Sequence, residues 1–251
     1  MIRFRLLGSV GVCRDSGDGA AVAGTRRRAL LAMLLLNAGN DVTFGSLAEA
    51  VWPEGEPPRS VNALQAQITR LRRYLAERLD GRQLIETRGF GYRIVLRPGD
   101  LDLERFEHLR RAARQRAGSD PGGALDLLRT ALALWQGPAL ADIRDHSATL
   151  HAAAVQAEEN RMLAIEELID LNFRLGRHGR IIGDLKRLAA EYPMRERLYG
   201  RLIIALGKTG RRAEAAQYFR RTHEQMVDEL GISPSSELNQ VLADILADPQ
   251  G

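Results

Sequence analysis

The segment VWPEGEPPRSVNALQAQITRLRRYLAERLD, residues 51–80, and the run IETRGFGYRIVL behind it constrain the fold most. Together they predict an entry loop, one amphipathic helix and a basic β-hairpin, in that order. At about 100° per residue, Val61, Leu64, Ile68, Leu71 and Leu75 fall within one narrow apolar stripe of the helix. This stripe predicts that one helix face is buried and that the opposite face meets solvent or a ligand.

The opposite face of this helix carries side chains that suit DNA. Arginine can bind guanine with two hydrogen bonds, asparagine and glutamine can read adenine, and the methyl groups of threonine and alanine can meet thymine. Ser60 is predicted to cap the helix, which leaves backbone N–H groups at Val61 and Asn62 available to a phosphate. The predicted DNA-contacting residues here are Arg59, Ser60, Asn62, Gln65, Ala66, Thr69, Arg70 and Arg73. An ordinary solvated helix face is the alternative.

The hairpin LIETR-GFG-YRIVL strengthens the DNA hypothesis. Gly89 and Gly91 can supply positive φ angles at its turn. Arg88 and Arg93 flank the tip, where a narrow minor groove would attract them, although they could serve only solubility. Tyr92 is expected to pack back onto the domain. A helix-turn-helix followed by such a wing predicts DNA binding.

Charge is unevenly distributed along the 251 residues. Residues 1–100 hold 15 Arg, no Lys and 10 acidic residues (+5), and residues 101–251 hold 21 basic and 22 acidic residues (−1), for a net +4. An excess of positive charge in the first hundred residues is expected if that part of the chain attracts DNA phosphates. The single cysteine, Cys13, excludes an intramolecular disulfide and, with no signal peptide or membrane span expected, favours the cytoplasm.

The residue pattern along the chain predicts two domains. Residues 2–24 suggest two or three short strands, Thr25 is expected to cap a first helix, and a second helix follows Thr43. A sheet in front of three helices and a hairpin is typical of the OmpR/PhoB type of winged helix. From Asp100 onward about seven helices are expected, and Gly176 and Gly210 lie one tetratricopeptide period of 34 residues apart. Leu168 and Leu202, Ile169 and Ile203, and Arg177 and Arg211 share that spacing.

The predicted fold is therefore an α+β winged helix-turn-helix, residues 1–98, followed by an all-α tetratricopeptide-like domain, residues 99–251. Trp52 and Trp135 are expected to be buried, because that is the usual fate of a large aromatic side chain. A generic helical bundle is the alternative to the repeat.

Several long motifs in order resemble the Streptomyces antibiotic regulatory protein family over nearly the whole chain. In the first domain they are RRRALLAMLLLNAGNDV, LAEAVWPEGEPPRSVNALQAQITRLRRYL and RGFGY. In the second, LDLERFEHL, ALALWQGPALADI, EYPMRERLYGRLIIALGKTGRRAEAAQYF and DELGISPSSEL resemble the bacterial transcriptional activation domain. The chain departs from the family pattern at Phe90, where proline is usual, and at Gln136, where arginine is frequent.

The resemblance implies a transcriptional activator of secondary-metabolite (antibiotic) genes. Its implied partners are double-stranded DNA with tandem direct repeats near promoters, RNA polymerase holoenzyme, and further copies of itself on DNA; no membrane partner is expected. A length of 251 residues matches the short members, without room for the nucleotide-binding and sensor domains of long ones.

Three other classes of protein are alternatives to a DNA-binding activator. An enzyme is disfavoured because Cys13 has no evident base, the histidines are scattered and a GxxxxGK[ST] loop is absent, so no catalytic residue, metal or cofactor is predicted. A response regulator would need a receiver domain, which nothing before the winged helix supplies. A protein-interaction scaffold without sequence-specific DNA binding stays the main alternative.

Overall fold

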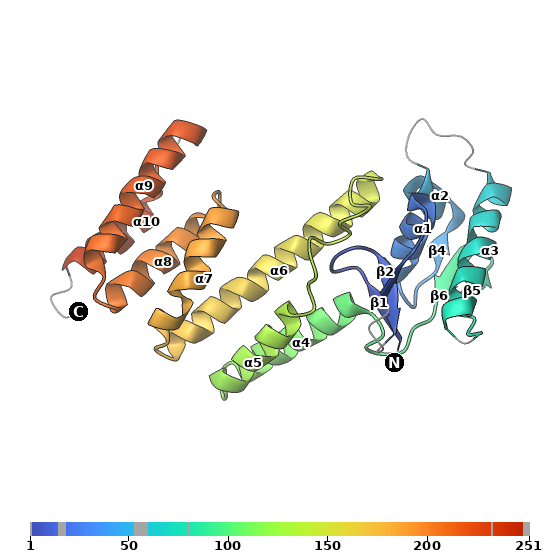
Figure 1. Ribbon diagram of the computed structural model, residues 1–251, viewed down its shortest axis with the longest axis horizontal. Coiled ribbons are helices and arrows are strands. Elements are labelled where there is room, and N and C mark those ends of the chain that lie inside the picture. Colours follow the sequence, from blue (N-terminus) through green and yellow to red (C-terminus); the bar gives the residue numbers. More distant parts are fainter. Residues whose placement is uncertain (1, 15–18, 53–59, 80, 232, 248–251) are drawn as a thin grey trace. The chain divides into compact units, whose positions relative to one another are not determined.

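The computed structural model describes residues 2–14, 19–52, 60–79, 81–231 and 233–247. They form two compact units, Met1–Arg116 with Asp126–Ile165, and Ala117–Leu125 with Glu166–Gly251 (Figure 1). The first unit therefore contains the winged helix together with part of the helical half. The domain boundary after residue 98 stays a prediction.

A small antiparallel sheet begins the first unit. Strands β1 (Ile2–Arg5), β2 (Gly11–Arg14) and β3 (Gly19–Ala21) pair in that order, with Phe4 opposite Val12. Phe4 and Val12 are both buried, as are Leu6 and Leu7 in the turn after β1. This is the N-terminal sheet that the turn-rich first residues predict.

Three helices follow the sheet. They are α1 (Thr25–Leu36), α2 (Phe44–Val51) and α3 (Val61–Arg78). Helix α2 follows Thr43 as predicted, and Thr43 caps it by accepting a hydrogen bond from the N–H of Ser46. The prediction that Thr25 caps α1 is wrong: Gly24 holds the cap position at φ 89°, and the Thr25 hydroxyl instead accepts a bond from Arg28.

The wing is a two-stranded hairpin that a third strand extends. Strands β5 (Ile85–Arg88) and β6 (Gly91–Ile94) pair antiparallel, and β4 (Val42–Thr43) pairs with the other edge of β6. Arg88 lies opposite Gly91, so Gly89 and Phe90 form a two-residue turn. Neither Gly89 nor Gly91 has a positive φ, contrary to expectation. Gly91 is needed for a close approach, because a Cβ there would lie 2.7 Å from the Val42 carbonyl carbon.

One buried carboxylate ties the first sheet to helix α4 (Asp102–Arg116). Asp102 is 7% exposed, and its two oxygens accept hydrogen bonds from the N–H groups of Leu6, Leu7 and Leu103 at 2.7–3.1 Å. The N–H of Phe4 also donates to the carbonyl of Asp100 at 2.7 Å. Backbone groups at the end of β1 thus find partners at the start of α4, as buried polar groups require.

A loop between α5 (Pro121–Leu132) and α6 (Ala148–Arg174) packs on the same sheet end. The N–H of Gln136 donates to the carbonyl of Leu7, and that of Leu140 donates to the carbonyl of Leu6, both at 2.9 Å. Asp142 binds the N–H of Val10 and pairs with Arg28 at 3.0 Å. The winged helix and this part of the helical half therefore share hydrogen bonds within one compact unit.

Both tryptophans are buried, as predicted. Trp52 is 1% exposed. Trp135 packs edge-on against Phe106, with ring centroids 5.5 Å apart, and Arg161 lies over its indole at 4.8 Å. Each tryptophan anchors the core of the first unit.

The second unit is helical. After the C-terminal part of α6 it contains α7 (His178–Glu191), α8 (Glu196–Lys208), α9 (Arg212–Leu230) and α10 (Ser236–Ala247), which makes seven helices after Asp100 in the described part of the chain. Helix α8 packs against α7, α9 and α10. None of the helices described here has the length and apolarity that crossing a membrane would demand.

The 34-residue spacing corresponds to repeated local geometry. Gly176 and Gly210 both adopt the left-handed conformation, at φ 66° and 74°. Arg177 and Arg211 follow them as the N-cap residues of α7 and α9, with φ/ψ of −87°/35° and −91°/46°. Ile169 and Ile203 are both buried. The same turn thus connects successive antiparallel helices, as in stacked helical hairpins.

We expect Gly91→Ala to destabilise the winged helix by about 1–3 kcal/mol, because overpacking against rigid backbone forces strand β4 away from β6. Gly89→Ala is the matched control, since a Cβ there meets nothing within 4 Å. Urea unfolding of both variants measures the difference. Equal stability of the two would contradict the close approach at Gly91.

We expect Asp102→Asn to destabilise the protein by about 1–3 kcal/mol, because either amide orientation turns an NH₂ donor toward a backbone N–H. Asp100→Asn, two residues away, is the control and should change stability little.

The cost of Asp102→Asn should also depend on pH. Burial raises the pKa of Asp102 from 3.8 to about 6, although hydrogen bonds from Leu6, Leu7 and Leu103 oppose the shift. The folded state thus holds its proton more tightly than the unfolded state does. The resulting stabilisation is complete below pH 4 and is lost as pH rises through about 6. The wild-type advantage over Asp102→Asn should therefore shrink across that range; an advantage that grows would contradict it.

Candidate nucleic-acid interface

The outward face of α3 is the main candidate surface. Its predicted DNA-contacting residues are all exposed in the structure: Ser60, Asn62, Gln65, Ala66, Thr69, Arg70 and Arg73. Ser60 accepts a hydrogen bond from the N–H of Ala63 at 3.2 Å, which confirms the predicted cap. Arg59 lies outside the described residues. The helix therefore presents amide, methyl and guanidinium groups to a ligand over more than two turns.

The inward face of α3 holds the helix on the domain. Leu64, Ile68, Leu71 and Leu75 are buried as the apolar stripe predicts, and α3 packs against α1 and α2. The inclusion of Val61 in that stripe is wrong, because its side chain is 50% exposed. Val61 is the first helical residue, so no turn of the helix precedes it to complete its burial.

Two side chains on the outward face already have partners. The Thr69 hydroxyl donates to the carbonyl of Gln65 at 2.9 Å, which leaves its methyl group as the part that can meet a base. Arg73 lies 3.8 Å from Glu77 in an exposed i,i+4 pair. Such a pair contributes little, so a DNA base or phosphate can replace Glu77 at low cost.

Arg72 fixes the wing against α3. Its guanidinium donates to the carbonyl of Ile85 at 2.9 and 3.2 Å and to the Thr87 hydroxyl at 2.9 Å. It also lies 5.6 Å from the centre of the Tyr92 ring. Sequence reasoning missed this role, although Arg72 sits at the edge of the apolar stripe, where a long side chain can reach a neighbouring element. Helix α3 and the wing are thus held in one relative orientation.

The two wing arginines are partly neutralised. Arg93 donates to Asp41 at 2.7 Å, and Arg88 lies 3.6 Å from the same carboxylate and pairs closely with Glu86. All four side chains are partly or largely open to solvent. Asp41 and Glu86 were not predicted. The structure therefore places Arg88 and Arg93 together, but around a carboxylate that DNA phosphates would have to replace.

A groove of about 730 Å³ separates α3 from β5. Its walls include Arg72, Arg73 and Arg82 together with Glu86 and Thr87. The positive charge comes from Arg72 and Arg73 on the helix side and from Arg82 in the loop before β5, and it suits a phosphate backbone, whereas Glu86 on the strand side opposes one.

Tyr92 packs onto the domain, as predicted. It is 3% exposed and meets Phe44 edge-on at 5.5 Å. Phe90, two residues earlier, is 85% exposed at the tip of the wing. The hairpin thus keeps one aromatic side chain in the core and presents the other to solvent.

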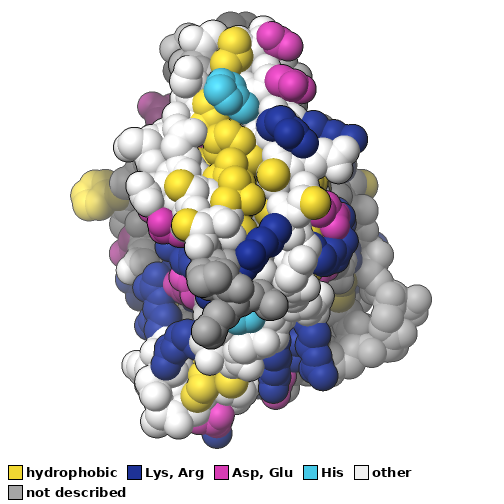
Figure 2. All heavy atoms as spheres, turned by 90° about the vertical axis from the view of Figure 1, so that its left-hand side faces the viewer, with side chains coloured by type: hydrophobic (Ala, Val, Ile, Leu, Met, Phe, Trp, Pro, Cys, Tyr) yellow, Lys and Arg dark blue, Asp and Glu magenta, His cyan; other side chains and the backbone are white. Residues whose placement is uncertain are grey.

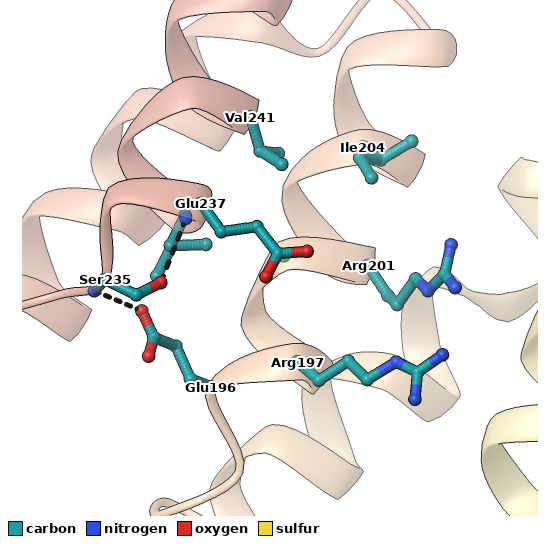
Figure 3. Close-up of a pocket in the computed structure, with 9 residues that line it drawn as sticks. Glu196, Arg197, Arg201, Ile204, Ser235, Glu237 and Val241 are labelled. Carbon is teal, nitrogen blue, oxygen red and sulfur yellow. Dashed lines mark hydrogen bonds between the residues drawn. The ribbon is translucent and has the colours of Figure 1, made fainter.

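The second unit offers surfaces of another kind. Figure 2 looks onto the face that includes α9 and α10, over which hydrophobic side chains gather in a band; Val227 and Leu246 of these helices are 42% and 52% exposed. A pocket of about 430 Å³ lies between α8 and α10 (Figure 3), where Glu196 accepts the N–H of Ser235 at 2.6 Å and Ser235 caps α10. Within the described ranges, no three His, Cys, Asp or Glu side chains gather as a metal site.

Both arginines of that pocket are engaged within the unit. Arg197 pairs with Glu166 at 2.7 Å, and Arg201 pairs closely with Asp170. These ion pairs connect α8 to α6, so the two arginines serve to hold helices together.

Comparisons with known proteins match both halves of the chain. Residues 20–94 match the family described as "Transcriptional regulatory protein, C terminal", and residues 101–246 match the "Bacterial transcriptional activator domain". The first match covers the helices and wing described above, and the second covers α4 to α10.

Individual relatives agree with these matches. The regulatory protein AfsR of Streptomyces coelicolor is 37% identical over 99% of this chain, which spans 24% of AfsR. The transcriptional regulator RedD of the same organism is 35% identical over 98% of this chain, which spans 71% of RedD. A solved structure of Mycobacterium tuberculosis EmbR in complex with a low affinity phosphopeptide superposes with a TM-score of 0.87 at 30% identity, over 98% of this chain and 65% of EmbR.

An α+β winged helix of the OmpR type precedes a wholly helical activator domain, and the relatives that share this arrangement are transcription regulators and not enzymes. The chain therefore belongs to the Streptomyces antibiotic regulatory protein family of DNA-binding transcriptional regulators.

Proposed function

We propose that this regulator activates a secondary-metabolite (antibiotic) biosynthetic gene cluster by binding tandem direct repeats near promoters. The observation that carries the proposal is the exposed polar face of α3, held by Arg72 beside a wing that bears Arg88 and Arg93. Family membership supports the class of target genes.

In the proposed complex, α3 enters the major groove and the wing reaches the adjacent minor groove. Arg70, Arg73 and the amides of Asn62 and Gln65 contact base edges, and the groove beside β5 follows the phosphate backbone. Direct repeats spaced by about one helical turn of 10.5 bp would place successive protomers on the same side of the duplex.

The helical half supplies protein contacts in this proposal. RNA polymerase holoenzyme and a neighbouring protomer on the next repeat are the partners. The hydrophobic band over α9 and α10 supports such contacts, because apolar side chains gathered on one face are typical of interaction surfaces. An interaction scaffold would use the same band but would show no preference among DNA sequences.

The proposal is tested by affinity selection of genomic DNA fragments with the purified protein at roughly physiological salt, where non-specific phosphate binding is weak. Enrichment of a tandem repeat upstream of a biosynthetic operon, together with stimulated transcription from that promoter in a purified system, is expected. Recovery of bulk DNA without sequence preference would refute it and favour the scaffold.

We expect Arg70→Ala and Arg73→Ala each to weaken binding to a selected repeat by about 1–3 kcal/mol if the side chain contacts guanine, with relaxed preference at one base pair. Arg220→Ala, an exposed arginine of α9, is the matched control and should bind as wild type does. Fluorescence anisotropy on matched and single-mismatch duplexes gives both quantities. Wild-type binding by both α3 variants would remove this face from the interface.

The wing arginines should behave differently. Arg88→Ala and Arg93→Ala should each weaken binding to all sequences alike and lower the slope of log Kd against log salt by about one unit. Asp41→Asn should strengthen binding and steepen that slope, because the carboxylate that neutralises both arginines is gone. Weaker binding by Asp41→Asn would mean that Asp41 positions the arginines and does not compete with phosphates.

A further inference from the structure

We propose that Phe90 is an apolar wedge at the wing tip that enters the DNA minor groove and bends the duplex there. The inference rests on the proposed function, because it assumes that the wing meets DNA. It adds a residue that selects deformable base steps without a hydrogen bond to any base.

The first observation is exposure. Phe90 is 85% exposed, the largest exposed fraction among the large hydrophobic side chains that the structure describes. A lone exposed hydrophobic residue is common on protein surfaces. Position makes this one informative, since it occupies one of the two turn residues at the tip of the wing.

The second observation is that a rigid frame carries this exposed ring. The N–H of Phe44 donates to the carbonyl of Phe90 at 3.0 Å, and Gly91 packs tightly on the backbone of Val42. Arg72 holds the strand before the turn through Ile85 and Thr87. A ring presented from a fixed backbone loses little entropy on binding, which favours insertion into a narrow space.

The third observation is the chemistry around the ring. Arg88 and Arg93 lie on the two strands that flank the turn, so cationic groups, each paired with an exposed carboxylate that phosphates could replace, border an apolar tip. A minor groove has the complementary pattern, with phosphates along both walls and sugars and stacked bases between them. Phenylalanine is one of the side chains that can part a base step from this groove and kink the duplex.

Continuity with α3 favours DNA over a protein partner. The same Arg72 side chain that contacts β5 also belongs to the helix whose outer face carries Asn62, Gln65 and Arg70. A wing fixed to a helix in the major groove has the next minor groove within its reach. The expected consequence is a preference for flexible pyrimidine–purine steps, such as TA, at the position under the wing.

The test uses the full chain and a single-repeat duplex that the wild-type protein has selected from a random-sequence pool. Wild type, Phe90→Ala and Phe90→Leu are compared for affinity and for DNA bending, measured by energy transfer between dyes at the duplex ends. Met194→Ala, which removes a side chain that is 68% exposed in the second unit, is the matched control. Thermal unfolding should not distinguish these variants, because neither side chain is part of a core.

Phe90→Ala is expected to lose about tenfold to a hundredfold in affinity, the value of burying one phenylalanine ring, and to lose most of the bend. Phe90→Leu should keep part of both. Replacing the step under the wing by a stiff A-tract should weaken wild type but leave Phe90→Ala nearly unchanged.

Three results would overturn the inference. An unchanged affinity and bend for Phe90→Ala would show that the ring stays outside the groove while the proposed function stands. A loss seen only on two-repeat DNA would assign Phe90 to a contact with a neighbouring protomer. A wild-type protein that selects no sequence from the pool would refute the proposed function and this inference together.

Discussion

The buried carboxylate of Asp102 is the interaction on which the first unit depends most. It accepts backbone hydrogen bonds from the turn after β1 and from the first turn of its own helix, in a place largely shielded from water. Burying the carboxylate without these hydrogen bonds would be costly. Without Asp102, the backbone N–H groups that donate to it would be left unpaired. The N-terminal sheet and the start of the helical half are therefore mutually required.

This mutual requirement gives the DNA-binding part a firm base. The loop after α5 adds further bonds to Leu6 and Leu7, and Asp142 reaches Val10 and Arg28. A change in this loop can thus alter the N-terminal sheet and, through the pair of Asp142 with Arg28, helix α1. The winged helix and α4 therefore belong to one compact unit, joined by the hydrogen bonds of Asp102.

In the candidate interface, the residues that fix the position of the wing differ from those that set its charge. Arg72 and Gly91 fix where the wing lies, through a side chain on one side and a backbone contact on the other. Asp41 and Glu86 then reduce the positive charge that Arg88 and Arg93 present. Such neutralisation lowers the attraction of Arg88 and Arg93 to any phosphate, whereas the polar face of α3 lies outside these ion pairs. In the proposed complex, this arrangement would favour selective over indiscriminate binding to DNA.

The sequence was sufficient wherever short-range periodicity decides the structure. The spacing of Leu64, Ile68, Leu71 and Leu75 determined which face of α3 is buried, and with it which residues are exposed to solvent. Ser60 is predictable as a cap because a cap is a bond within one turn, although the same reasoning wrongly assigns a cap to Thr25. The 34-residue spacing of Gly176 and Gly210 predicts a repeated turn, because the conformation of a turn also depends on neighbouring residues.

Tertiary structure decided what depends on residues far apart in the chain. The partners of Asp102, Arg72 and Arg93 lie 96, 13 and 52 residues away, and no local pattern specifies which backbone group or carboxylate will be near. The sequence marks Gly91 as a turn residue, but only its contact with Val42 explains why a side chain cannot fit. The sequence by itself determined the elements, their exposed faces and the class of ligand. The folded chain decided how the wing is held, which charges are neutralised and which aromatic ring remains outside, because packing in three dimensions sets those distances.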